Sequence, residues 1–295
     1  MKSIQVKNFR SFQDSGKIEF NNVNLFLGKN SSGKSSILRL FPLFKQSILH
    51  ELRGPFMWYD ETYDFGSFSN VLSRHPSGDG KLKFLIELEL PKNNCPDTGC
   101  EECFIYEEKN IPFLKDSMSC LLEMVVDGDS KGTFLQELTF HLDNHVISLS
   151  SKQRTGYVEI FIDGIKLNTS PVKWKYKTKG LLPDMISKIP TGRRFLLSKL
   201  FRLSNLDTIK SSDLEELINY ASFQEEDIYK YLKGLQQNSL AKVLIDTYKP
   251  NTKDFSLLCG NLNLYAINKL MFFIDQLIRA DFQRSSYIEP IRFGF

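Results

Sequence analysis

Export signals, disulfide-forming cysteines and membrane-length apolar runs are scarce or missing in this sequence. Only five cysteines, an odd number, occur in 295 residues. The opening MKSIQVKNFRSF lacks the apolar centre of a secretion signal. No apolar run approaches the length needed to cross a membrane. These features argue against a disulfide scaffold and predict a protein of the reducing cytoplasm.

A strong excess of charge is also missing. The formal net charge is only +3, so a surface for an anionic partner would have to be local. No internal repeat or low-complexity segment interrupts the chain. Its length allows one large domain or two ordinary ones, each with a proper core.

Glycine and serine are concentrated in FLGKNSSGKSSIL, residues 26–38. The apolar run Asn24–Leu27 predicts a short buried strand, and helical spacing begins after Lys34. Gly28, Gly33, Lys34 and Ser35 complete the pattern G-x-x-x-x-G-K-[ST] between that strand and that helix. In this context the pattern predicts a phosphate-binding loop.

Each residue type in the loop has a physical role toward phosphate. Glycines allow backbone angles that turn successive amides toward an anion, and the helix N-terminus adds further N–H donors. Lys34 is expected to reach the β and γ phosphates, and the Ser35 hydroxyl to ligate Mg²⁺. The predicted nucleotide-binding residues are Gly28, Lys29, Asn30, Ser31, Ser32, Gly33, Lys34, Ser35 and Ser36.

Alternating polarity predicts further strands. Ser3–Val6 and Lys17–Phe20 flank the polar turn KNFRSFQDSG, and Pro42 should kink or end the helix that follows the phosphate loop. KLKFLIELEL, at 81–90, alternates as a half-buried strand does. Four more strand-like pieces follow at 120–128, 133–143, 145–150 and 157–167, the last with a tight hairpin at Asp163-Gly164.

From about residue 180 the pattern becomes helical. Ser212 with Glu215, and Ser222 with Glu225, fit capping boxes. Residues 266–282 predict an amphipathic helix, and SSYIEPIR at 285–292 a short closing strand. The expected organisation is a core with its first helix and loop (1–80), an antiparallel β lobe (81–170), a mainly helical insertion (171–285) and a return strand (286–295).

The start I-x-V-x-NFRSF, the loop LFLGKNSSGKSSIL and the β-rich region after it resemble the N-terminal half of an ABC-type ATPase head. The relatives are the SMC, RecF and OLD-like proteins. The segment GPFMWYDETYDFGSFSNVLSR (54–74) and the later YIEPIR (287–292) resemble most closely the OLD-like ATPases of bacterial anti-phage defence systems, including retron-associated ones. The resemblance implies an α/β P-loop fold with an antiparallel β lobe and a helical insertion.

The resemblance also implies site residues, cofactors and partners. The NFRSF turn lies beside the nucleotide in such heads, so Asn8, Arg10 and Ser11 become candidates for phosphate or ribose contacts; a solvent-exposed turn is the alternative for Arg10. ATP and Mg²⁺ are the implied cofactors. Two heads would sandwich ATP in a homodimer or larger assembly, associated with a nuclease, a reverse transcriptase or another defence effector.

Two motifs that hydrolysis needs in this class are missing: an apolar strand ending in Asp-Glu, and a signature loop. LMFFID ends in Asp275, but Gln276 follows it and the surrounding spacing is helical. EIFID ends in Asp163, but the hairpin Gly164 follows. LSSKQ, at 149–153, falls inside the β region. In the family both motifs come after the YIEPIR-like strand, so we expect these 295 residues to be the front portion of a longer polypeptide.

Three cysteines lie close together in CPDTGCEEC. Cys95, Cys100 and Cys103 would bind zinc if Cys120 or His75 supplied a fourth ligand. The spacing lacks a second paired knuckle, and reduced thiols on a surface loop are the alternative.

A basic stretch runs from Lys173 to Arg202, with nine Lys or Arg and one acid, Asp184. Trp174 and Tyr176 alternate with the first lysines, which would place lysines and aromatics on opposite faces of an extended segment. Such clustering suits a DNA or RNA backbone, and a strand edge guarded by lysines is the alternative. The candidate contacts are Lys173, Lys175, Lys177, Arg193 and Arg194.

Three functions fit the phosphate loop. The first is an ATP-driven engine of a defence or repair complex, and the second is a nucleotide sensor that binds ATP without turnover. The third, a small-molecule kinase or GTPase, is disfavoured because no Asn-Lys-x-Asp motif follows the loop and a β lobe is foreign to simple kinases.

Overall fold

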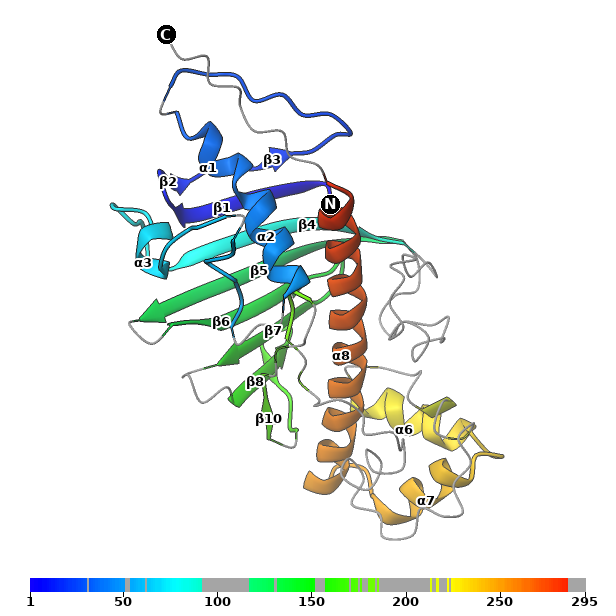
Figure 1. Ribbon diagram of the computed structural model, residues 1–295. Coiled ribbons are helices and arrows are strands. Elements are labelled where there is room, and N and C mark those ends of the chain that lie inside the picture. The colour runs from blue at the N-terminus through cyan, green and yellow to red at the C-terminus, as the bar shows by residue number, and fades with distance from the viewer. Residues whose placement is uncertain are drawn as a thin grey trace.

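Ten strands form a single sheet, and all their pairings are antiparallel. The computed structural model describes residues 1–30, 32–50, 54–61, 63–91, 117–129, 132–151, 157–169, 171–174, 176, 180–183, 185, 213, 216–217, 222 and 224–285. The strand order is β10-β8-β7-β6-β5-β4-β1-β2 (Figure 1). In addition, β3 pairs with β1 and β9 pairs with β8. The strands are β1 (Ser3–Phe9), β2 (Phe12–Asp14), β3 (Ile18–Glu19), β4 (Leu82–Leu90), β5 (Met118–Asp129), β6 (Gly132–His141), β7 (Val146–Ser151), β8 (Tyr157–Ile162), β9 (Ile165–Lys166) and β10 (Val172–Lys173).

The predicted antiparallel meander is confirmed from β4 to β9. Along β4 the even-numbered residues from Leu82 to Leu90 are buried and the residues between them are more exposed, as the alternation required. Asp163 and Gly164 have φ angles of 51° and 79°, so both central residues of the hairpin between β8 and β9 are left-handed. That is the geometry of a type I′ turn.

The first strand connects the phosphate-loop region to the meander. β1 pairs with β4 over five residue pairs, among them Ile4↔Ile86 and Val6↔Phe84. On its other edge β1 pairs with β2 and β3. The strands before and after residue 80 therefore belong to one continuous sheet.

The predicted strand Asn24–Leu27 is wrong. This segment has no strand partner in the described part of the chain, and Leu25 and Leu27 are each 81% exposed. Both edges of β1 are already occupied, so the apolar run has no open edge of that strand to join. Local sequence gave it strand character, but strand formation also requires a neighbour.

The helix after the phosphate loop is broken as Pro42 predicted. It divides into α1 (Lys34–Leu38) and α2 (Leu40–Leu49), with Arg39 between them. Pro42 has no N–H for the carbonyl of Leu38, four residues earlier, so the hydrogen-bond ladder is interrupted there. The other helices described are α3 (Phe68–Val71), α6 (Glu225–Gly234), α7 (Ser239–Thr247) and α8 (Lys253–Arg284).

One face of the sheet is covered by α2 and the C-terminal half of α8 (Figure 1). The ring of Phe44 on α2 stacks on Phe282 of α8 at 4.6 Å and meets Phe84 of β4 edge-on at 5.4 Å. The N-terminal half of α8 instead packs against α6 and α7 in a second apolar cluster. The long helix thus links the sheet to a helical subdomain.

Neither capping box expected in the C-terminal half is found among the described residues. The expected box of Ser222 with Glu225 is wrong, because α6 begins at Glu225 after Gln224 and the Ser222 hydroxyl instead donates to Asp227. Ser212 and the expected return strand at 286–295 lie outside the described residues. Asn238 and Thr252 supply the side-chain caps of α7 and α8.

By length and composition α8 is apolar enough to span a membrane, contrary to the expectation that no apolar run reaches that length. Of its most apolar window, 89% is buried inside the protein. This burial identifies α8 as a core helix.

A carboxylate in the C-terminal half of α8 holds a distant segment in place. Asp275 Oδ1 accepts hydrogen bonds from the backbone N–H groups of Leu181 and Leu182, at 2.7 and 2.8 Å. Gly180 before them has φ 140°, and a Cβ there would overlap the Asp275 carboxylate. Asp275 is 1% exposed, so its role in this structure is to satisfy buried backbone donors.

Replacing Asp275 should therefore destabilise the fold. In Asp275→Ala two buried N–H groups lose their acceptor, and we expect the free energy of unfolding to fall by about 2–4 kcal/mol. Urea denaturation followed by circular dichroism measures this loss. The control Asp246→Ala, at an exposed position of α7, should change the same quantity by less than about 0.5 kcal/mol. Equal stability of the two variants would contradict the assigned role.

Candidate nucleotide site

The phosphate loop lies between the exposed segment 21–27 and the start of α1. Gly33 immediately precedes α1 and has φ 88°, a left-handed conformation that favours glycine. Ser32 and Ser35 are exposed, and Gly33, Lys34 and Ser36 are partly exposed. Ser31 lies outside the described residues. The loop therefore presents its backbone and hydroxyl groups to solvent at a helix N-terminus.

The Lys34 side chain folds back into this loop. Its ammonium group donates to the carbonyl oxygens of Gly28 and Lys29, both at 2.6 Å. A third, longer contact of 3.4 Å reaches Ser32 Oγ. The cation is thus held among oxygen acceptors at the centre of the loop, where a phosphate group would be its strongest partner.

The β1–β2 turn packs directly against the loop, as the resemblance implied. A Cβ on Gly33 would overlap the Phe12 ring and lie 3.1 Å from Ser11 Oγ. Ser11 Oγ also lies 3.4 Å from Ser36 Oγ. Ser11 and Phe12 therefore support the loop from the side, and Phe12 is a contact that sequence analysis missed because its apolar ring carries no phosphate chemistry.

Arg10 occupies the tip of that turn with φ 51°. Its N–H donates to the carbonyl of Val71 at 2.7 Å, and its guanidinium lies 5.4 Å from the centre of the Phe65 ring. Burial, and then the nearby positive charge of Arg39, lower the pKa of Arg10. The buried Nε has no hydrogen-bond partner within the described residues.

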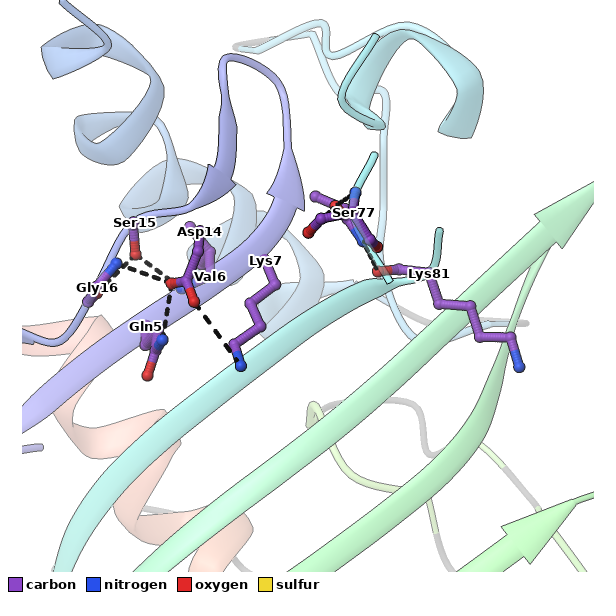
Figure 2. A network of polar contacts seen from close by, with 9 residues as sticks. Gln5, Val6, Lys7, Asp14, Ser15, Gly16, Ser77 and Lys81 are labelled. Carbon is purple, nitrogen blue, oxygen red and sulfur yellow. Dashed lines mark hydrogen bonds and ion pairs between the residues drawn. The ribbon is translucent and has the colours of Figure 1, made fainter. Parts of the chain in front are cut away.

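Asn8 has a structural role. It is 2% exposed, and its amide donates at 3.0 and 2.8 Å to the carbonyls of Ser77 and Lys81, two residues labelled in Figure 2. Its side-chain oxygen accepts from the N–H of Ser77 at 2.7 Å. These bonds commit the side chain to the 77–81 loop, so the expected contact of Asn8 with a nucleotide is not supported.

Only the beginning of the basic stretch lies within the described residues. Trp174 and Tyr176 pack against the main core, as the alternation predicted. Lys173, on edge strand β10, places its ammonium 4.2 Å from the centre of the Tyr157 ring. Lys175, Lys177, Arg193 and Arg194 lie outside the described residues.

Asp275 and Asp163, which end the sequences that resemble a magnesium-binding strand, both have structural roles. Asp275 lies within α8, as the helical spacing predicted. Asp163 accepts from the N–H of Val146 at 2.8 Å and bonds His145 Nδ1 at 2.8 Å, which fixes the β8–β9 hairpin. Backbone hydrogen bonding, followed by His145, lowers the pKa of Asp163.

The zinc hypothesis has no structural support in the described residues, where no cluster of three metal-ligating side chains occurs. Cys120 is buried in β5, and burial raises the pKa of its thiol to about 12. His75 lies on the surface near the β1–β2 turn, where its carbonyl accepts from Gln13. Cys95, Cys100 and Cys103 lie outside the described residues.

Comparison with known proteins agrees with this geometry. A family model described as "AAA ATPase domain" matches residues 1–270. No curated protein matches the chain. The match extends over the phosphate loop, the antiparallel sheet and most of α8, so the ATPase assignment applies to the described fold and not to the loop alone.

Contact between the β1–β2 turn and the loop yields a double-variant test. Gly33→Ala introduces a methyl group at a left-handed residue and against the Phe12 ring, and we expect ATP affinity to fall at least about tenfold, measured by calorimetry. Adding Phe12→Ala should recover part of this loss by removing the clash. Gly164→Ala is the control, because it has φ 79° with open space around it, far from the loop. Equal ATP affinity in Gly33→Ala and Gly164→Ala would contradict the packing argument.

Proposed function

Because the chain belongs to the AAA ATPase domain family, we propose that it binds ATP with Mg²⁺ through residues Gly28–Ser36. Lys34 would exchange its loop carbonyls for the β and γ phosphate oxygens, and the exposed Ser35 hydroxyl would ligate Mg²⁺. Amides at the start of α1 would add neutral donors. The observation that supports this most is the Lys34 ammonium already centred in a complete G-x-x-x-x-G-K-S loop.

The proposed activity is ATP hydrolysis by a head of the SMC, RecF and OLD-like kind. Two heads would close around ATP, each completing the other's site. The cycle of ATP binding and hydrolysis would move the two heads. These movements would control an associated nuclease, reverse transcriptase or other nucleic-acid-processing effector in cytoplasmic anti-phage defence. The support for this part is the NFRSF, GPFMWYDETYDFGSF and YIEPIR stretches.

A nucleotide-sensing scaffold without turnover is the second candidate. It is favoured by the roles of the two acidic residues that end strand-like sequences. Asp275 satisfies backbone donors and Asp163 fixes a turn, so neither is available to hold Mg²⁺ or polarise water. A sensor would release its partner when ATP binds, whereas an engine would require hydrolysis.

Lys34→Ala tests ATP binding. The variant removes the ammonium group that donates to the Gly28 and Lys29 carbonyls, and ATP affinity should fall by at least about a hundredfold in calorimetry with Mg²⁺ present. Lys29→Ala is a matched control, since the loop uses the Lys29 carbonyl rather than its side chain. Unchanged ATP affinity in Lys34→Ala would refute the proposed site.

A measurement of ATP turnover distinguishes a chain that only binds ATP from one that hydrolyses it. We expect these 295 residues alone to release phosphate far more slowly than about 1 per second, the lower end of ordinary enzyme rates. The reason is that neither Asp163 nor Asp275 is placed to act on water. A rate near or above that value, lost in Lys34→Ala, would show that a catalytic carboxylate is present and has been overlooked.

A further inference from the structure

A cavity of about 270 Å³ lies between α2, the segment that follows it and the C-terminal end of α8. Asp60 and Tyr63 line the side that faces α2, and Ser285, the residue after α8, also lines it. None of the described residues of the phosphate loop lines the cavity, so it is separate from the proposed nucleotide site. Along α2 and its C-cap the lining residues form two neighbouring rows at a spacing of four, which are Phe41, Lys45 and Leu49, and Pro42, Gln46 and His50.

The wall opposite α2 is held in place before any ligand arrives. Gln46 Nε2 donates to the carbonyl of Met57 at 2.5 Å, and the N–H of Met57 donates to Ser47 Oγ at 3.0 Å. The chain then turns back on itself, because the N–H of Phe65 donates to the carbonyl of Trp58 at 2.8 Å. This pre-organisation lowers the entropy cost of binding a ligand against α2.

One end of the cavity is apolar and the other is charged. The ring centre of Phe41 lies 5.3 Å from that of Phe20 and 5.9 Å from that of Phe282, so aromatic rings surround the end near α8. At the other end of α2, His50 Nε2 lies 3.7 Å from Asp60 Oδ1. A ligand that fits both ends would carry an apolar ring and a polar group.

The polar groups of the cavity are only weakly engaged. Among the described residues the Asp60 carboxylate contacts only His50, at a distance longer than a hydrogen bond. Lys45 is exposed and forms no ion pair with the described residues. Gln46 is 4% exposed, and its Oε1 is a buried acceptor without a partner in the described part of the chain. The cavity therefore offers one cation, one anion and an unused acceptor.

We propose that this cavity binds a small zwitterion with an aromatic ring, of the kind represented by a free aromatic amino acid. The ring would lie among Phe41, Pro42 and Tyr63. The ligand carboxylate would pair with Lys45 and its ammonium group with Asp60. The size of the cavity supports this class, since about 270 Å³ is just below the roughly 300–1,000 Å³ of pockets for drug-sized ligands.

A ligand with a single charge fits this cavity less well. An aromatic acid would bring its negative charge toward Asp60, and an aromatic amine would leave Lys45 without a partner. A zwitterion satisfies both side chains, and the difference between these affinities is the expected source of selectivity.

The test of the ligand class uses the full chain with L-phenylalanine, phenethylamine and 3-phenylpropanoate, which share a ring and differ in charge. Saturation-transfer NMR detects binding, and a titration gives each affinity. L-phenylalanine should bind with a Kd of about 1 mM or tighter, and each singly charged analogue at least about fivefold more weakly. Binding of L-phenylalanine should persist in Lys34→Ala, so this site and the proposed ATP site can fail separately.

Two variants assign the charged contacts. Lys45→Glu should weaken L-phenylalanine binding at least about tenfold and remove its advantage over phenethylamine, because the carboxylate loses its partner. Asp60→Asn should remove its advantage over 3-phenylpropanoate. These ratios would not change if a variant only lowered the folded fraction of the chain.

Lys242→Glu is the matched control, since it makes the same charge reversal at an exposed position of α7 outside the cavity. It should leave L-phenylalanine affinity within about twofold. Three results would overturn the proposal: no binding of L-phenylalanine by the wild-type chain at about 10 mM, equal affinity for the three ligands, or an equal loss in Lys45→Glu and Lys242→Glu.

Discussion

The stacking of Phe44 between the sheet and α8 determines where most of the other parts lie. Its ring contacts Phe84 on β4, Phe282 on α8 and Phe56 from the following loop. Because Phe44 lies on α2, directly after the helix that begins at the phosphate loop, these contacts locate the loop relative to the sheet. Burying a phenylalanine in this way contributes about 1.5–3 kcal/mol, which is substantial against the net stability of a domain.

A second constraint comes from β1, whose two edges are both occupied. Pairing with β4 places the β1–β2 turn at the same end of the sheet as the loop after α3, and the backbone bridge Phe9↔Leu72 brings them together. For this reason Arg10 and Arg74 line the same groove beside the phosphate loop, although 63 residues lie between them in the sequence. The basic character of the groove is a property of the tertiary structure.

Sequence patterns predicted the structure correctly where a feature depends only on residues that are close together in the chain. The alternation in residues 81–90, the Asp163-Gly164 turn, the break near Pro42 and the helical spacing around Asp275 each depend on neighbours within a few residues. Asn24–Leu27 failed because a strand also needs a partner edge. The role of Asn8 and the position of Arg74 could not be predicted, since both depend on which distant loop packs against β1.

The break between α1 and α2 gives the phosphate loop a degree of mechanical independence. A continuous helix would act as a rigid rod, so any tilt at the loop would strain the aromatic packing around Phe44. Pro42 leaves the Leu38 carbonyl without its helical donor, but Arg39 keeps both of its helical partners: its N–H donates to Ser35 at 3.0 Å and its carbonyl accepts from the N–H of Leu43 at 3.2 Å. The five-residue α1 is therefore still tied to α2 through Arg39, and the missing bond at Leu38 is the place where a tilt of the loop would meet less resistance.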